Sequence, residues 1–131
     1  MKLELKHIAP YLPYKVKVYN SNAYPLCGLF EMNHNGGAGM IAISELLASP
    51  KLYKIALRSM YDLEDSSKNY LNLLNELGQK VEYKGGYFSD GVALFDDPCW
   101  LPYVSFEFLL ENHFDVFGLI DHGLAIDINH L

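Results

Sequence analysis

The segment from residue 113 to residue 130 holds the densest group of side chains that could do chemistry. It contains three histidines and three aspartates, namely His113, Asp115, Asp121, His122, Asp127 and His130. Imidazoles and carboxylates are common metal ligands and general bases. Their spacing matches no HExxH helix, no paired CxxC and no twelve-residue calcium loop. Gly118 and Gly123 interrupt the segment, so these side chains need not converge. We therefore expect no metal site and no cofactor.

His113 is the strongest single candidate for a metal or substrate ligand or a general base, and Asp115 and His122 are candidates for the same site. A helix predicted over residues 103–114 would place His113 in the middle of an apolar face. Burial there favours the neutral imidazole and requires a hydrogen-bond partner. Two interpretations stay open: a core histidine satisfied by one such partner, or the centre of a small enzyme or ligand-binding protein.

No other motif indicates catalysis. The glycine-rich stretch 36–39 lacks the Lys-Ser/Thr pair of a phosphate-binding loop, and we interpret it as a hairpin loop. No Gly-x-Ser-x-Gly elbow is present, and Asp96 and Asp97 are interpreted as turn and cap residues. Cys27 and Cys99 are expected to be free thiols in apolar surroundings. The sequence therefore names no catalytic residue and favours a non-enzymatic protein.

Aromatic side chains point towards binding instead. Phe108 falls on the polar side of its predicted helix, so it is either covered by another part of the fold or offered to a partner. We take Phe108, Glu111 and Trp100 as candidate partner-binding residues. Ten tyrosines and seven phenylalanines make a high aromatic load, and exposed aromatics inside a charged rim are typical of interfaces.

Charge is unevenly distributed along the chain. Residues 1–60 carry seven basic against three acidic residues, whereas residues 61–131 carry three against thirteen. The basic half suggests an alternative, a nucleic-acid-associated factor that would use Lys2, Lys6, Lys15, Lys17, Lys51, Lys54 and Arg58. The acidic half repels phosphate backbones, so nucleic acid is the less favoured partner.

Length and composition predict one domain. A chain of 131 residues, half of them hydrophobic, can bury a core of its own. No apolar run approaches the roughly 20 residues of a membrane span. The N-terminus lacks the apolar stretch of a secretory signal, so we expect a cytoplasmic protein.

Several short segments alternate apolar and polar residues or lie between turn signals, as strands do. They cover residues 15–19, 24–32, 40–43, 54–58, 81–95 and 124–128, with turns at 20–22, 85–86 and 89–91. Residues 24–32 are expected to pair with 15–19 as a hairpin.

Helices are predicted over residues 3–9, where Pro10 and Pro13 should end the helix, and over one turn at 44–48. Two longer amphipathic helices follow, at about 66–77 and 103–114. Asp65 is expected to cap the first of these, and Gly78 to end it in the left-handed region. We expect a single-domain α+β fold, a mostly antiparallel sheet packed by these two helices.

Three stretches carry a resemblance to a known family: MKLELKHIAPYLPY at residues 1–14, LRSMYDL at 57–63, and ENHFDVFGLIDHGLAIDIN at 111–129. Together they resemble a family of short uncharacterised proteins encoded in Bacteroidetes genomes, commonly in phages or other mobile elements. The resemblance implies an intracellular, phage-related origin and assigns no role to any residue. We expect an accessory protein that binds a host or phage protein, with self-association possible.

Overall fold

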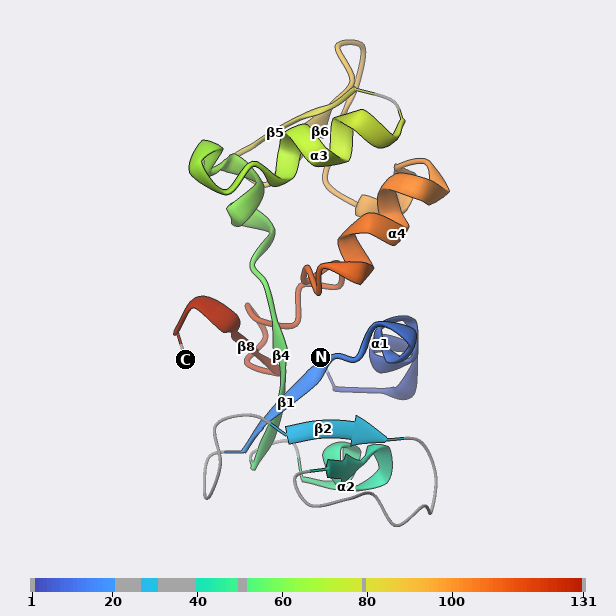
Figure 1. Ribbon diagram of the computed structural model, residues 1–131, viewed down its shortest axis with the longest axis vertical. Helices are drawn as coiled ribbons and strands as arrows, with labels where there is room; N and C mark the ends of the chain where they lie inside the picture. The colour runs from blue at the N-terminus through green and yellow to red at the C-terminus, as the bar shows by residue number, and fades with distance from the viewer. Residues whose placement is uncertain (1, 21–26, 31–39, 50–51, 79, 131) are drawn as a thin grey trace.

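The computed structural model describes residues 2–20, 27–30, 40–49, 52–78 and 80–130. Within them the chain forms an α+β fold in which antiparallel strand pairs predominate, as predicted. Two tiers are visible in Figure 1, a lower one built on a five-stranded sheet and an upper one containing a three-stranded sheet and two helices.

The chain begins with a short helix, α1 (Leu5–Ile8), that tightens into a 3-10 helix, η1 (Ala9–Tyr14). The α-helix ends at Ile8, just before Pro10, as predicted, but the chain continues as the 3-10 helix η1, which contains both Pro10 and Pro13. Proline's fixed φ suits a 3-10 turn, and Pro10 stands at its first turn, where no backbone donor is needed. The 3-10 helix ends at Lys15, which is left-handed with a φ of 55°.

The lower sheet has the strand order β3-β2-β1-β4-β8. Its strands are β1 (Lys17–Asn20), β2 (Cys27–Phe30), β3 (Met40–Ala42), β4 (Tyr53–Leu57) and β8 (Ala125–Asp127), and helix α2 (Ile43–Ala48) follows β3. Strand β1 is antiparallel to both β2 and β4. Its pairing with β2 confirms the predicted hairpin. Strands β2 and β3 are parallel, so the prediction of a hairpin loop at 36–39 is wrong. That loop and the predicted turn at 21–22 lie outside the described residues.

The upper sheet is the predicted antiparallel meander of β5 (Glu82–Lys84), β6 (Tyr87–Ser89) and β7 (Leu94–Phe95). Gly85 and Gly86 form its first turn with φ of 61° and 89°, a conformation that favours glycine. Two short 3-10 helices, η2 (Met60–Glu64) and η3 (Ser66–Lys68), lead from the lower tier towards it.

Both long helices are shorter than predicted. Asp65 caps η3 rather than a long helix. Asn69 then interrupts the helical conformation with a φ of 61°, and α3 (Tyr70–Leu77) begins after it. Gly78 ends α3 in an extended conformation, not in the predicted left-handed one. Helix η4 (Pro98–Trp100) precedes α4 (Tyr103–Glu111), which ends before residue 114.

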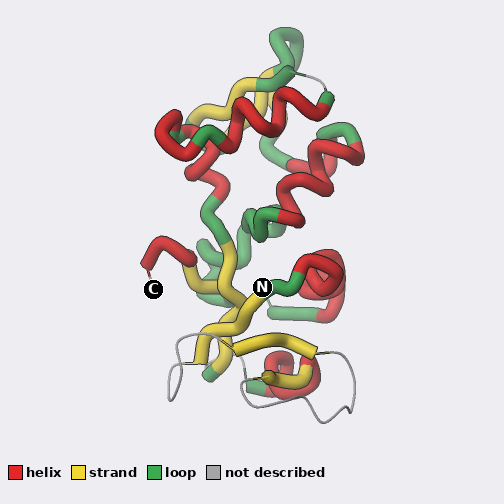
Figure 2. Tube along the Cα trace, viewed as in Figure 1, coloured by secondary structure: helices red, strands yellow, loops and turns green. Residues whose placement is uncertain are grey.

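Backbone and side-chain contacts at one junction join the two tiers. Arg58, just after β4, forms an isolated parallel bridge with Phe114, just after α4. The buried hydroxyl of Tyr11 donates to the Phe114 carbonyl and accepts from the Val116 N–H. Three segments far apart in the sequence therefore meet here, below α4 and beside β4 in Figure 2. The chain ends with β8 and a last 3-10 turn, η5 (Ile128–His130).

Replacing Tyr11 with phenylalanine tests this junction. Tyr11→Phe removes both hydrogen bonds of a fully buried hydroxyl while keeping the ring, so the free energy of unfolding should fall by about 2 kcal/mol. Urea denaturation measures the change, with Tyr87→Phe, at an exposed position, as the control. Equal stability of the two variants would show that the hydroxyl does not hold the tiers together.

Candidate functional site

An aromatic face lies at the start of α4. We define it by Trp100, Tyr103, Val104 and Phe108. Trp100 and Tyr103 are both 75% exposed and Val104 is 50% exposed, which is unusual for three large apolar side chains so close in sequence. Phe108 is partly buried and packs against the core, so it forms the inner margin of the face.

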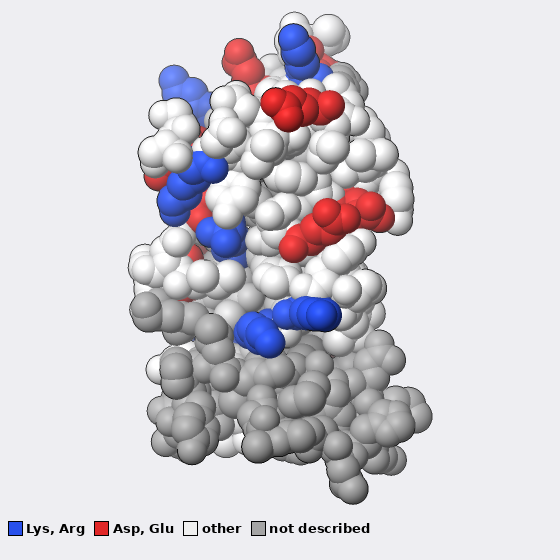
Figure 3. Space-filling view, in the orientation of Figure 1, with Lys and Arg blue, Asp and Glu red and all other residues white. Residues whose placement is uncertain are grey.

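Acidic groups border the aromatic face. Glu107 and Glu111 lie on the same helix, and none of residues 85–131 is Lys or Arg. The Glu107 carboxylate raises the pKa of the Tyr103 hydroxyl, through hydrogen bonding and through its negative charge. Figure 3 shows acidic side chains over α4 and uncharged surface between them and α3. The face therefore combines apolar area with negative charge.

Helix α3 packs against α4 and extends this apolar surface. Leu74 is buried, but Leu73 and Leu77 are 40% and 47% exposed, so this predicted amphipathic helix buries only part of its apolar face. The two helices approach closely at Gly78, where an added Cβ would lie 3.6 Å from the Ser105 hydroxyl. That hydroxyl is buried and has no partner within the described part of the chain, which indicates that a small side chain matters there more than a polar one.

The three predicted partner-binding residues lie on or beside the aromatic face. Trp100 and Glu111 are exposed, and Phe108 is the least accessible of the three. The sequence prediction missed Tyr103 and Val104. The signal was present, because Val104 precedes Phe108 by one helical turn and therefore shares its side of the helix.

The prediction that His113 lies in the middle of an apolar helix face is wrong, because α4 ends at Glu111. His113 stands just after the helix with a φ of 61°, and its N–H donates to the Leu110 carbonyl while the Phe114 N–H donates to Leu109. These two bonds form a Schellman motif, in which a left-handed residue closes the helix. The imidazole Nε2 is 2.6 Å from the Tyr14 carbonyl oxygen, which can only accept, so Nε2 carries the proton. His113 thus ties α4 to η1.

Asp115 is buried, and its carboxylate is held by backbone donors. It accepts from the N–H groups of Leu119 and Ile120, both at 2.8 Å. Burial raises the pKa of this carboxyl, the backbone hydrogen bonds lower it, and the nearby charge of Asp121 raises it further. The carboxylate therefore organises the loop that follows it rather than orienting His113.

The other predicted chemical groups do not converge on His113. His122 and His130 are exposed, and the Asp127 carboxylate accepts from the Asn129 N–H. Among the residues that the structure describes, no group of three His, Cys, Asp or Glu side chains is placed to hold a metal ion. Asp97, by contrast, caps η4 through the Cys99 N–H, in line with its predicted role.

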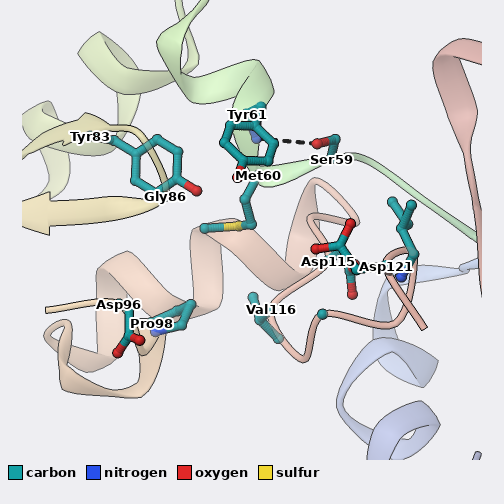
Figure 4. A pocket seen from close by; sticks show the side chains of 12 residues that line it. Ser59, Met60, Tyr61, Tyr83, Gly86, Asp96, Pro98, Asp115, Val116 and Asp121 are labelled. Atoms are coloured by element: carbon teal, nitrogen blue, oxygen red, sulfur yellow. Dashed lines mark hydrogen bonds between the residues drawn. The ribbon is translucent and has the colours of Figure 1, made fainter. Parts of the chain in front are cut away.

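Asp115 and Asp121 instead line a cleft of about 210 Å³ between the two tiers. Asp96, Tyr61 and Tyr83 line it as well, and Figure 4 shows these side chains around the common space. Neither tyrosine belongs to a recognisable motif, because they come from η2 and β5 and meet the aspartates only in the fold. The spacing along the chain held no signal for this cleft.

The basic residues of the N-terminal half are only partly free for nucleic acid. Arg58 lies inside the junction, 3.6 Å from Asp62 and with its guanidinium 4.9 Å from the Tyr70 ring centre. Lys54 donates to the Gly123 carbonyl, and Lys6 pairs with Glu4 at 3.3 Å.

Cys99 is exposed, so its predicted apolar surroundings are wrong. A hydrogen bond with Asp97 raises the pKa of its thiol, which makes it a weak nucleophile. The side chain of Cys27 lies outside the described part of the structure.

The sequence matches no protein-family model and no curated protein, and the fold matches no solved structure. None of the helices in the described ranges is both long and apolar enough to cross a membrane. Evidence for function therefore comes from this chain's own residues.

A structural role for His113 predicts a loss of stability on its removal. His113→Ala should lower the free energy of unfolding by about 1 kcal/mol, because the link to the Tyr14 carbonyl is lost. His122→Ala, at an exposed position, is the control and should change nothing. Thermal denaturation measures the stability of both variants. If His113→Ala were as stable as the parent protein, the structural role would be contradicted.

Asp115 should titrate above the usual value of 3.8. Because its pKa is higher in the folded than in the unfolded state, its contribution to stability is complete at low pH and is lost as pH rises through the folded pKa. Carbon NMR of the carboxyl groups measures this pKa. Asp65 is the internal control, since hydrogen bonds from Ser67 lower its pKa. A pKa of Asp115 at or below that of Asp65 would show that burial is not the dominant influence on the Asp115 carboxyl.

Proposed function

We propose that this protein is a small accessory protein that acts by binding another protein through the aromatic face. The observation that carries the proposal is the exposure of Trp100, Tyr103 and Val104 next to the glutamates of α4. Exposed aromatic residues inside a charged rim have the composition of interface centres.

The charge of the face selects the partner. Glu107 and Glu111 border it, and no basic residue from position 85 onward balances them. A partner segment with lysines or arginines beside apolar side chains would match both properties, and the opposite charges would also speed the encounter. The proposed occupant is therefore a basic amphipathic helix of another protein.

Trp100 makes the proposal directly measurable, because it is the only tryptophan of the chain and lies on the face. The probe is a synthetic amphipathic helical peptide with leucines on one side and lysines on the other. Its binding should shift the Trp100 fluorescence to shorter wavelength and saturate. A peptide with glutamate in place of each lysine should give no shift.

Val104→Glu should weaken binding of the lysine peptide at least about tenfold, because it places a charge in the apolar centre of the face. The matched control is Val92→Glu, at a position that is 94% exposed and lies in the turn between β6 and β7. Thermal midpoints of both variants should stay near that of the parent protein. Equal binding by the two variants, or equal binding of both peptides, would contradict the proposal.

Two other results would also contradict it. A fluorescence shift that depends on protein concentration without peptide would indicate that a second copy covers the face. Tight binding to DNA or RNA that weakens steeply with salt would favour the nucleic-acid alternative through Lys15 and Lys17, which are both exposed.

A further inference from the structure

Helices α3 and α4 pack antiparallel along a seam. At one end of the seam the rings of Tyr70 and Phe114 meet edge to face, with centres 5.1 Å apart. At the other end an added Cβ at Gly78 would lie 3.6 Å from the Ser105 hydroxyl. The start of α3 therefore lies beside the residues just after α4, and the end of α3 lies beside the first turn of α4.

Both helices leave apolar side chains exposed on the same side of this seam. Around each helix these side chains are turned by about 60° to 140°, in the same sense, from Gly78 and Ser105, which face the seam. Because the helices run in opposite directions, the same sense of rotation leads to the same side of the seam. These side chains form one apolar strip, which we define by Leu73, Leu77, Val104 and Phe108.

Glutamates border the apolar strip on both of its outer edges. On α3, Glu76 follows Leu73 by three positions and lies beside it on the side away from the seam. On α4, Glu111 follows Phe108 by three positions and lies in the corresponding place. Figure 3 shows acidic side chains over both helices and uncharged surface between them. None of the ion pairs among the described residues involves either glutamate, so both edges of the strip are negative.

These two edges select the occupant of the strip. The axes of packed helices are about 8–10 Å apart, so a third helix laid over the seam contacts both α3 and α4. It matches the strip when an apolar stripe lies between basic residues on each flank. A second copy of this chain would instead bring its own acidic edges against these, which is unfavourable.

We propose that a helix of the partner protein lies along the seam of α3 and α4, with its apolar stripe on the apolar strip. Lysines or arginines on its two flanks face Glu76 on one side and Glu111 on the other. This inference rests on the function proposed above and extends its binding surface from α4 to α3. It makes α3, which contributes nothing to the aromatic face, half of the contact.

Leu77→Glu tests the contribution of α3. This variant should weaken binding of the lysine peptide at least about tenfold, as Val104→Glu should, because it places a charge in the strip. Trp100 fluorescence measures the binding, and Val92→Glu is the control. In the parent protein, the amide NMR signals of Leu73 and Leu77 should shift and saturate with the lysine peptide, which tests the contact without a substitution.

The results distinguish this inference from the proposed function. If Val104→Glu weakens binding, Leu77→Glu does not and the α3 amides stay unshifted, the partner contacts α4 alone. That result would overturn this inference and leave the proposed function standing. If the parent protein does not bind the lysine peptide, both are contradicted. Shifts of the α3 amides that follow protein concentration without peptide would also overturn the inference, because a second copy would then cover the strip.

The edge on α3 has a test of its own. Glu76→Gln should weaken binding of the lysine peptide about threefold at low salt, and the effect should vanish at high salt. Glu82→Gln is the matched control, because it makes the same change of charge at an exposed position on β5. A peptide with the same number of lysines confined to one flank should bind more weakly than one with lysines on both. Equal effects of the two glutamine variants, or equal binding of the two peptides, would overturn the two-edged contact.

Discussion

The two tiers of this protein depend on a few hydrogen bonds at the junction of Tyr11, Arg58 and Phe114. The Arg58 N–H donates to the His113 carbonyl at 2.7 Å, and the Asp115 N–H donates to the Arg58 carbonyl at 2.8 Å. The Tyr11 hydroxyl satisfies two more backbone groups of the same segment. Buried backbone groups without partners would each cost free energy, so these bonds fix where the chain can pass. They thereby set the position of α4 above the lower sheet.

The acidic second half of the chain has few cations to balance it, and its carboxylates are satisfied in other ways. Asp97, Asp115 and Asp127 accept backbone N–H groups, which stabilise the ionised form. Glu107 instead contributes to the raised pKa of the Tyr14 and Tyr103 hydroxyls. Asp96 and Asp121 have no such partner among the described residues, and both line the cleft. The same shortage of cations leaves both the aromatic face and the cleft with negative charge.

Local patterns predicted much of the fold. Alternation predicted β1, β4 and β8, the Gly85-Gly86 pair predicted the upper hairpin, and the class is α+β as expected. Helix ends were predicted less well, because Asn69 and His113 both adopt a left-handed conformation. Asn and His adopt this conformation more often than most residues, but the apolar pattern does not locate it at these two positions. The parallel pairing of β2 with β3 was also missed, since it depends on contacts beyond the neighbouring turn. For the same reason the sequence indicated Trp100 and Phe108 but not the cleft, whose tyrosines and aspartates meet only after folding.

The most direct test of this account is native-state hydrogen exchange at the junction. If the segment after α4 is architecture that joins the tiers, the amides of Arg58, Asp115 and Val116 should exchange as slowly as the slowest amides of β1 and β4. They should also show the denaturant dependence of global unfolding. Rapid exchange at these three positions, with β1 and β4 still protected, would show that the tiers separate without unfolding and would contradict the account.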